Sequence, residues 1–156
     1  MKGLIIRSPW IDLILSGSKT WEMRTRPTSI RGRIAMIKAG SGLIYGTAEL
    51  TECLHALTFE QLRQTQSFHA IPELQLQSAV ESRWTTPWVL RDIDKLGSPI
   101  PYIHRKGAVT WVELADDILK GNPQQPGKIM KPKEYVGIVQ TKQYSGPRFS
   151  DNKLRW

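Results

Sequence analysis

The chain has 156 residues, of which 40% are hydrophobic, with six tryptophans and a formal net charge of +8. That length suits one compact domain with a short appendage. No apolar run approaches the roughly 20 residues that a membrane-spanning helix needs, and no signal-peptide cleavage site follows the opening residues, so we expect no membrane partner. Cys53 is the only cysteine, which excludes an intrachain disulfide and favours a reducing cytoplasm as the location.

The positive charge is concentrated at the two ends of the chain. Residues 1–38 hold eight Lys and Arg against two acidic residues, a balance of +6, and residues 116–156 hold eight against four, a balance of +4. Residues 39–115 hold six against eight, a balance of −2. This asymmetry favours a basic face and a polyanionic partner over diffuse solubilising charge.

The first residues predict a strand, a short helix and a second strand. Residues 3–8 form a short run rich in β-branched side chains, which is typical of a buried strand. Ser8 fits the N-cap and Pro9 the first position of a helix over residues 10–16. Gly17 fits the left-handed residue that closes such a helix.

Residues 17–26 contain one acid and three cations. If residues 20–26 are extended, side chains alternate, so that one face carries charge and the other meets a core. The side chains expected on the charged face are Glu22, Arg24 and Arg26. Lys19 would lie at the bend before the strand, free to swing over either side.

Two interpretations of this charged stretch stay open on spacing alone. The array could hold a phosphate, a carboxylate or a polarised carbonyl, with Glu22 as hydrogen-bond acceptor or proton carrier. Alternatively, it is an edge strand whose charges are only solvated or paired with one another.

The middle of the chain predicts a small, strongly bent antiparallel sheet with a polar helical insertion. The expected strands cover residues 34–39, 43–50, 85–96 and 107–114, with a turn at residues 40–42 and a bulge or bend at Gly46. Gly97 to Pro101 should interrupt the third of these strands. Thr58 should cap a helix with Gln61 as its capping-box partner, residues 67–72 should be a loop, and residues 73–82 should be helical again.

Sites of other types are not indicated. Cys53 and His55 could lie on one strand face, but no second pair with zinc-site spacing exists, so we expect no metal. The sequence has no phosphate-cradling P-loop, no dinucleotide fingerprint and no nucleophile elbow, and we expect no cofactor.

Beyond residue 116 the chain becomes linker-like and basic. Residues 135–139 could add one more strand, and the stretch from Tyr144 to Trp156 mixes Pro, Gly and basic residues with Phe149 and Trp156. This terminus would either pack over the surface of the domain or form a basic, aromatic arm that binds nucleic acid.

Six segments together carry a family resemblance over about residues 3–115. The central one, Gly17-x-Lys19-x-x-Glu22-x-Arg24, resembles the signature of the ASCH domain family. The others, in order, are Ile6 to Trp10, Arg31 to Ala35, Trp88 to Leu90, Pro99 to Tyr102 and Gly107 to Trp111. The resemblance implies an α+β fold, a small PUA-like, mostly antiparallel β-barrel with short helices flanking a basic cleft. It also implies an ASCH domain over residues 1–115, with residues 116–156 as a basic extension that packs on the barrel or is partly flexible.

The same resemblance implies that RNA or a nucleotide binds in a cleft between the barrel and the short helix, beside the signature. The residues that we expect to contact nucleic acid are Arg7, Trp10, Lys19, Glu22, Arg24, Arg26, Lys38, Tyr45 and Tyr102. The cations would meet phosphates or base edges, and an aromatic ring would stack a base.

A hydrolase is the alternative. Some members of the family are ribonucleases, and some small relatives hydrolyse acetylated cytidine with a lysine and a threonine of the signature. Lys19 matches that lysine, but Glu22 occupies the position of the threonine. The metal-independent mechanism considered for this chain therefore has Lys19 stabilising negative charge and Glu22 as general base. A third possibility is a small-ligand or protein-binding module for which the basic face has no role.

Overall fold

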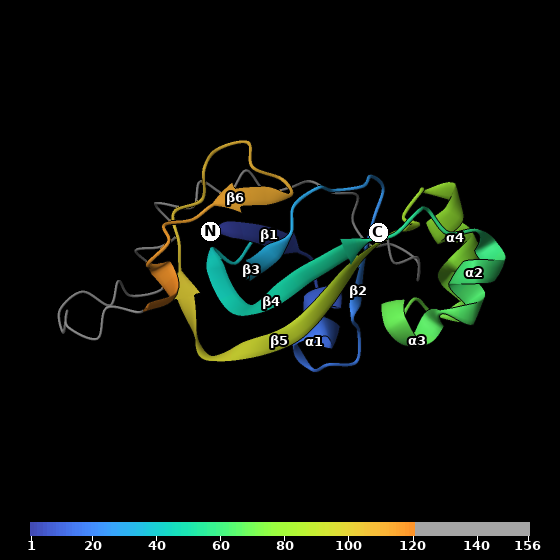
Figure 1. Ribbon diagram of the computed structural model, residues 1–156, viewed down its shortest axis with the longest axis horizontal. Coiled ribbons are helices and arrows are strands. Elements are labelled where there is room, and N and C mark those ends of the chain that lie inside the picture. Colours follow the sequence, from blue (N-terminus) through green and yellow to red (C-terminus); the bar gives the residue numbers. More distant parts are fainter. Residues whose placement is uncertain (121–156) are drawn as a thin grey trace.

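One curved six-stranded sheet forms the body of the protein (Figure 1). The computed structural model describes residues 1–120. The strands are β1 (Lys2–Ile6), β2 (Trp21–Arg24), β3 (Gly32–Lys38), β4 (Leu43–Cys53), β5 (Thr86–Pro101) and β6 (Trp111–Glu113). Their order is β2-β5-β4-β3-β1-β6; β1 and β3 are parallel, and the other neighbouring pairs are antiparallel.

The sheet curls so that its two ends approach each other without pairing as strands within residues 1–120. Arg24 of β2 donates a hydrogen bond from Nη2 to the backbone oxygen of Ile5 in β1, at 2.8 Å. Trp88 of β5 stacks on Trp111 of β6, with ring centroids 5.5 Å apart and planes at 13°. These contacts form a seam, here meaning Ile5, Arg24, Trp88 and Trp111. The result is a mixed half-barrel, which agrees with the predicted bent, mostly antiparallel sheet.

The short helix α1 (Trp10–Leu15) connects β1 to β2. Its inner side buries Trp10, Ile11 and Ile14 in the main core. Gly17 adopts φ +79° and donates its amide to the carbonyl of Ile14, as predicted for the residue that closes the helix. α1 therefore delivers the chain directly into β2.

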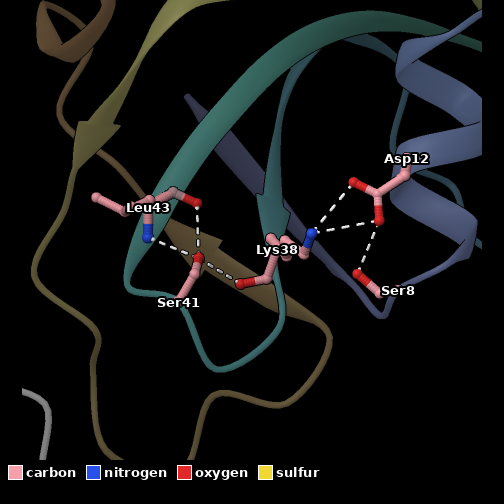
Figure 2. Close-up of polar contacts among 5 residues, drawn as sticks. All are labelled: Ser8, Asp12, Lys38, Ser41 and Leu43. Carbon is pink, nitrogen blue, oxygen red and sulfur yellow. Dashed lines mark hydrogen bonds and ion pairs between the residues drawn. The ribbon is translucent and has the colours of Figure 1, made fainter.

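The predicted N-cap role of Ser8 is wrong. Pro9 is the N-cap residue of α1, and no side chain caps the helix. The Ser8 hydroxyl instead donates to Oδ2 of Asp12 at 2.8 Å (Figure 2). Lys38, at the end of β3, donates to both oxygens of Asp12 at 3.2 Å, so this polar cluster links α1 to the sheet.

The β4–β5 connection is a helical insertion, which lies at one end of the sheet (Figure 1). It contains α2 (Phe59–Gln64), α3 (Gln66–His69), the 3-10 turn η1 (Glu73–Gln75) and α4 (Leu76–Glu81). The capping box between Thr58 and Gln61 is present, as predicted. The predicted loop over residues 67–72 is in part wrong, because α3 forms there and ends at Ala70 in the left-handed conformation.

Two strand predictions also need correction. β5 continues through Gly97 to Pro101, because Ile100 and Pro101 pair with Ile44 and Leu43 of β4 after an irregularity that absorbs the extra residues. The strand predicted over residues 107–114 is only three residues long, since Gly107 at φ +88° belongs to a turn. The register shift beside Gly46 confirms the predicted bulge.

The C-terminal features predicted over residues 135–139 and 144–156 lie outside the described residues. The last described element is the 3-10 turn η2 (Ile118–Lys120). Within residues 1–120, no helix has the length and apolar character to cross a membrane.

Candidate functional site

The signature residues occupy the link from α1 to β2 and the edge strand β2 itself. The Lys19 amide donates to the carbonyl of Leu13 at 3.1 Å, which ties the start of this link to α1. β2 pairs with β5 on its hydrogen-bonded side, with Glu22 opposite Trp88 and Arg24 opposite Thr86. The local fold thus brings Lys19, Glu22 and Arg24 together.

Lys19 is buried, which contradicts the expectation that it swings freely. Its side chain is 2% exposed. The ammonium donates to the backbone oxygen of Trp21 at 2.7 Å and lies 5.2 Å from the centre of the Trp10 ring. α1 supplies that ring, so helix packing over the link is what removes Lys19 from solvent.

Glu22 lies between two cations. Its Oε2 is 3.1 Å from Nζ of Lys19, and its Oε1 is 3.1 Å from Nη2 of Arg24. The Glu22 side chain is 5% exposed and that of Arg24 is 13% exposed. Lys19, Glu22 and Arg24 are called the ion cluster below. Their charges are paired with one another, as the second interpretation of this stretch held, but they are buried rather than solvated.

Arg24 joins the ion cluster to the seam. Besides its bond to the Ile5 carbonyl, its guanidinium carbon lies 5.5 Å from the centre of the Trp88 ring. Trp88 in turn donates its indole N–H to the backbone oxygen of Arg26 at 3.0 Å. One arginine therefore meets a carboxylate, a backbone carbonyl and an aromatic face.

Two atoms of the ion cluster have no hydrogen-bond partner among residues 1–120: Glu22 Oε2 and Arg24 Nε. The distance from Lys19 to Glu22 Oε2 is that of an ion pair, but no directed hydrogen bond joins the two atoms. Buried polar atoms in proteins normally have a partner. Among residues 1–120, Arg24 Nε is thus a buried donor without a hydrogen-bond acceptor, and Glu22 Oε2 is held by its ion pair with Lys19.

Burial lowers the pKa of Lys19 below its ordinary value. The negative charge of Glu22 acts in the opposite direction, and the positive charge of Arg24 adds to the lowering. With all three groups charged, the ion cluster carries a net charge of +1, so its field suits an anionic or electron-rich ligand.

His69 of α3 is fully buried beside the ion cluster. No feature of the sequence indicated that this histidine would lie there. Its Nε2 lies 2.8 Å from the carbonyl oxygen of Leu62, and its Nδ1 accepts the backbone amide of Ile71 at 3.0 Å. Nε2 therefore carries the proton, and the ring is neutral. Burial lowers the pKa of His69, the bond to Leu62 raises it, and the charge of Lys19 lowers it further.

The other predicted contacts lie in separate places. Lys38 contacts Asp12 and lies 5.7 Å from the centre of the Tyr45 ring. Tyr102 is half-buried, with its hydroxyl 2.9 Å from Nδ1 of His104. Tyr45 is also half-buried.

The remaining two arginines are exposed. Arg7 follows β1 and accepts the Ile11 amide on its backbone oxygen, and Arg26 follows β2. The structure thus groups the signature residues with Trp10, while Lys38 and Tyr45 form a second group, here called the Lys38 group.

An aromatic pair beside the signature escaped the sequence reasoning. Trp21 of β2 stacks on Phe68 of α3, with ring centroids 4.7 Å apart and planes at 16°. No sequence signal could have joined residues so far apart. Among residues 1–120, no group of three or more His, Cys, Asp or Glu side chains could hold a metal ion.

Comparison with solved structures supports the fold. The crystal structure of ASCH from Zymomonas mobilis has a TM-score of 0.60 at 18% identity, covering 76% of this chain and 90% of that one. Two mutant forms of the same protein, a tyrosine-to-phenylalanine and a serine-to-alanine substitution, each give a TM-score of 0.59 at 20% identity and cover 76% of this chain. The aligned part covers 93% of the tyrosine-to-phenylalanine mutant chain and 91% of the serine-to-alanine mutant chain. No protein of curated function matches the chain.

The sequence itself also matches a family model. The model of the ASCH domain covers residues 4–99, which include α1, the whole signature and all but the last two residues of β5. That range is more than half of the 156 residues. The chain belongs to the ASCH domain family.

Proposed function

We propose that this protein binds RNA or a nucleotide at the surface around the ion cluster. The observation that carries the proposal is the ion cluster of net charge +1, followed closely along the chain by the exposed Arg26. The field of such a cluster attracts the phosphates and the electron-rich base edges of RNA. The family is associated with nucleic acid, which agrees with this chemistry.

The proposed contacts fall into two kinds. Arg7 and Arg26 are exposed and would reach phosphates, as would Lys38 from the Lys38 group. Lys19 and Trp10 are buried and would support the site from below. The half-buried rings of Tyr45 and Tyr102 would contact bases at the margins, and the basic cleft predicted between barrel and helix would run between these groups.

The salt dependence of binding tests this proposal. For single-stranded RNA, the logarithm of the binding constant falls with the logarithm of salt concentration at a slope of about −0.7 per neutralised phosphate. We expect a steep slope for the wild type in EDTA, and a slope that is shallower by about 0.7 for Arg26→Ala. Fluorescence anisotropy of a labelled mixed-sequence oligonucleotide measures both.

Arg63→Ala is the matched control. Arg63 is an exposed arginine of α2, already paired with Glu73 at 3.4 Å, so its loss should leave the slope unchanged. Absence of binding at low salt, or binding that salt does not weaken, would refute the proposal.

A metal-independent hydrolase is the second candidate, and one observation favours it. Glu22 Oε2 is a buried carboxylate acceptor beside a lysine whose pKa is lowered. In the corresponding mechanism, Glu22 removes a proton from water, and the water oxygen attacks the phosphorus of RNA or the acyl carbon of a modified nucleoside. The P–O bond to the leaving ribose oxygen, or the acyl C–N bond, then breaks, and the proton held by Glu22 passes to the leaving oxygen or nitrogen. The Lys19 ammonium stabilises the negative charge that develops on the attacked group.

Glu22→Gln separates the two candidates. The amide keeps the shape of the side chain but cannot take a proton, so a hydrolase would lose at least about 100-fold in rate, the usual contribution of general base catalysis. Mixed RNA and acylated nucleosides are incubated with wild type and variant in EDTA. Full hydrolysis by the variant would exclude Glu22 as the general base. If the wild type binds RNA but hydrolyses neither substrate, the hydrolase candidate is excluded and the RNA-binding function stands.

A further inference from the structure

We propose that the outer face of Phe68 is a stacking platform for one nucleobase of bound single-stranded RNA. The proposal rests on the RNA-binding function above and assigns to it a contact that lies outside the signature. It also names the substrate form, a strand with an unstacked base, because a base inside a duplex has both of its faces covered by the neighbouring bases of the stack.

The geometry of the aromatic pair supports this role. Phe68 lies nearly parallel to Trp21 at 4.7 Å, so the indole covers one face of the phenyl ring. Phe68 nevertheless remains 45% exposed. A ring that is stacked on one side and exposed on the other can be extended by one more flat π system.

The platform is held in place before any ligand arrives. The backbone amide of Thr20 donates to the carbonyl of Phe68 at 2.9 Å, which joins α3 to the start of β2. The next residue, His69, is fixed at both ring nitrogens by backbone groups. A preorganised ring loses little side-chain entropy when a base stacks on it.

The platform is also connected to the ion cluster. Lys19 donates to the carbonyl of Trp21, and Glu22 follows Trp21 in the strand. A base on Phe68 would therefore lie near the segment that carries the +6 balance, where the neighbouring phosphates of the same strand would be attracted. Aromatic faces next to basic groups are the usual construction of single-strand binding sites.

The size of the exposed ring favours a base over a protein partner. A stable protein interface buries about 800 Å² on each side with about 20–30 residues, whereas one ring face matches one base.

The test compares Phe68→Ala and Phe68→Tyr with the wild type on a single-stranded oligonucleotide, with and without abasic positions. Phe68→Ala should weaken binding about 5- to 150-fold, the range for loss of one base–aromatic stack, without changing the salt slope. Phe68→Tyr, which keeps the π face, should bind like the wild type. The effect of Phe68→Ala should vanish on fully abasic RNA.

Phe59→Ala is the control, because Phe59 of α2 is a similarly exposed phenylalanine, at 39%, in the same insertion. Its affinity should equal that of the wild type; an equal loss in Phe59→Ala and Phe68→Ala would overturn the platform. Phe68→Leu keeps apolar packing on Trp21 and so guards against a folding defect. Near wild-type affinity in Phe68→Leu or Phe68→Ala would overturn the proposal as well.

The outcomes separate this proposal from the one that it rests on. Salt-sensitive RNA binding that is indifferent to Phe68 would overturn the platform alone. A wild type that binds no RNA at low salt would overturn both. Loss of a protein partner in Phe68→Ala, with RNA affinity intact, would assign the ring to a protein contact instead.

Discussion

At the scale of single residues, Glu22 has the most unusual environment, because one buried carboxylate serves two cations. Removing its charge would leave Lys19 and Arg24 buried without a counter-ion. Breaking a buried ion pair on one side costs about 3–5 kcal/mol. We expect Glu22→Gln to lower the free energy of unfolding by that amount in urea denaturation, whereas Glu52→Gln, from an exposed pair with Arg91, should cost less than about 1 kcal/mol.

His69 predicts how stability depends on pH. Its pKa is lowered in the folded protein, so the unfolded chain binds more protons as pH falls below about 6.5. The stability that comes from the neutral ring is therefore complete above that pH and is lost as pH falls through the unfolded pKa towards the lower folded one. Protonated Nδ1 could no longer accept the Ile71 amide.

The measurement is the urea midpoint as a function of pH. We expect the wild type to lose stability between about pH 7 and pH 5 more steeply than His69→Gln, which cannot titrate. His55→Gln, at an exposed histidine, should keep the wild-type slope. Parallel curves for the wild type and His69→Gln would show that His69 does not control this range.

At the scale of elements, Gly46 determines how closely α1 and β5 approach β4. A Cβ at Gly46 would lie 2.6 Å from the backbone oxygen of Asp94 and 2.6 Å from Cδ2 of Leu15. Because one of these neighbours is backbone, Gly46→Ala should destabilise the fold by about 1–3 kcal/mol through overpacking. Gly97→Ala on β5, with open space around it, is the control, and thermal unfolding compares the two.

The elements that sequence predicted well are those fixed by local rules. Short apolar runs bounded by glycine-containing turns located β3 and β4, the capping box located α2, and Gly17 located the end of α1. The errors have non-local causes. The end of β5 is a strand because β4 pairs with it, although Gly97 and two prolines argue against one locally.

The candidate site follows the same division. The signature identified Lys19, Glu22 and Arg24 and the strand that carries two of them, but not their burial. That burial depends on how Trp10 of α1 packs over Lys19, and on α3 of the helical insertion, a segment that was predicted in part as a loop. Phe68 was missed for the same reason, since its partner Trp21 is 47 positions earlier in the chain.

At the scale of the whole molecule, we expect residues 1–120 to fold as an independent unit. β6 pairs with β1, Leu114 is buried in the second core cluster, and the N-terminal ammonium contacts the Leu114 carbonyl and Asp116. A chain that ends after Lys120 should therefore keep the urea midpoint and slope of the full chain. Removal of residues from 107 onward, which deletes β6, should lower both.

A large loss of stability in the chain ending at Lys120 would contradict this boundary and make the basic extension part of the folded unit. RNA affinity of the same truncation reports separately on the seven Lys and Arg of residues 121–156. A reduced salt slope with unchanged stability would identify those residues as an arm for nucleic acid.

The stacked indoles of Trp88 and Trp111 give the seam an optical signature. Two such chromophores 5.5 Å apart couple their electronic transitions, and we expect the coupling to produce paired bands of opposite sign in far-ultraviolet circular dichroism. Because one ring belongs to β5 and the other to β6, these bands exist only while the half-barrel is closed. Trp111→Phe should abolish these bands. When the wild type is heated, the temperature at which the bands disappear would report the opening of the sheet, separately from the temperature at which the helices melt.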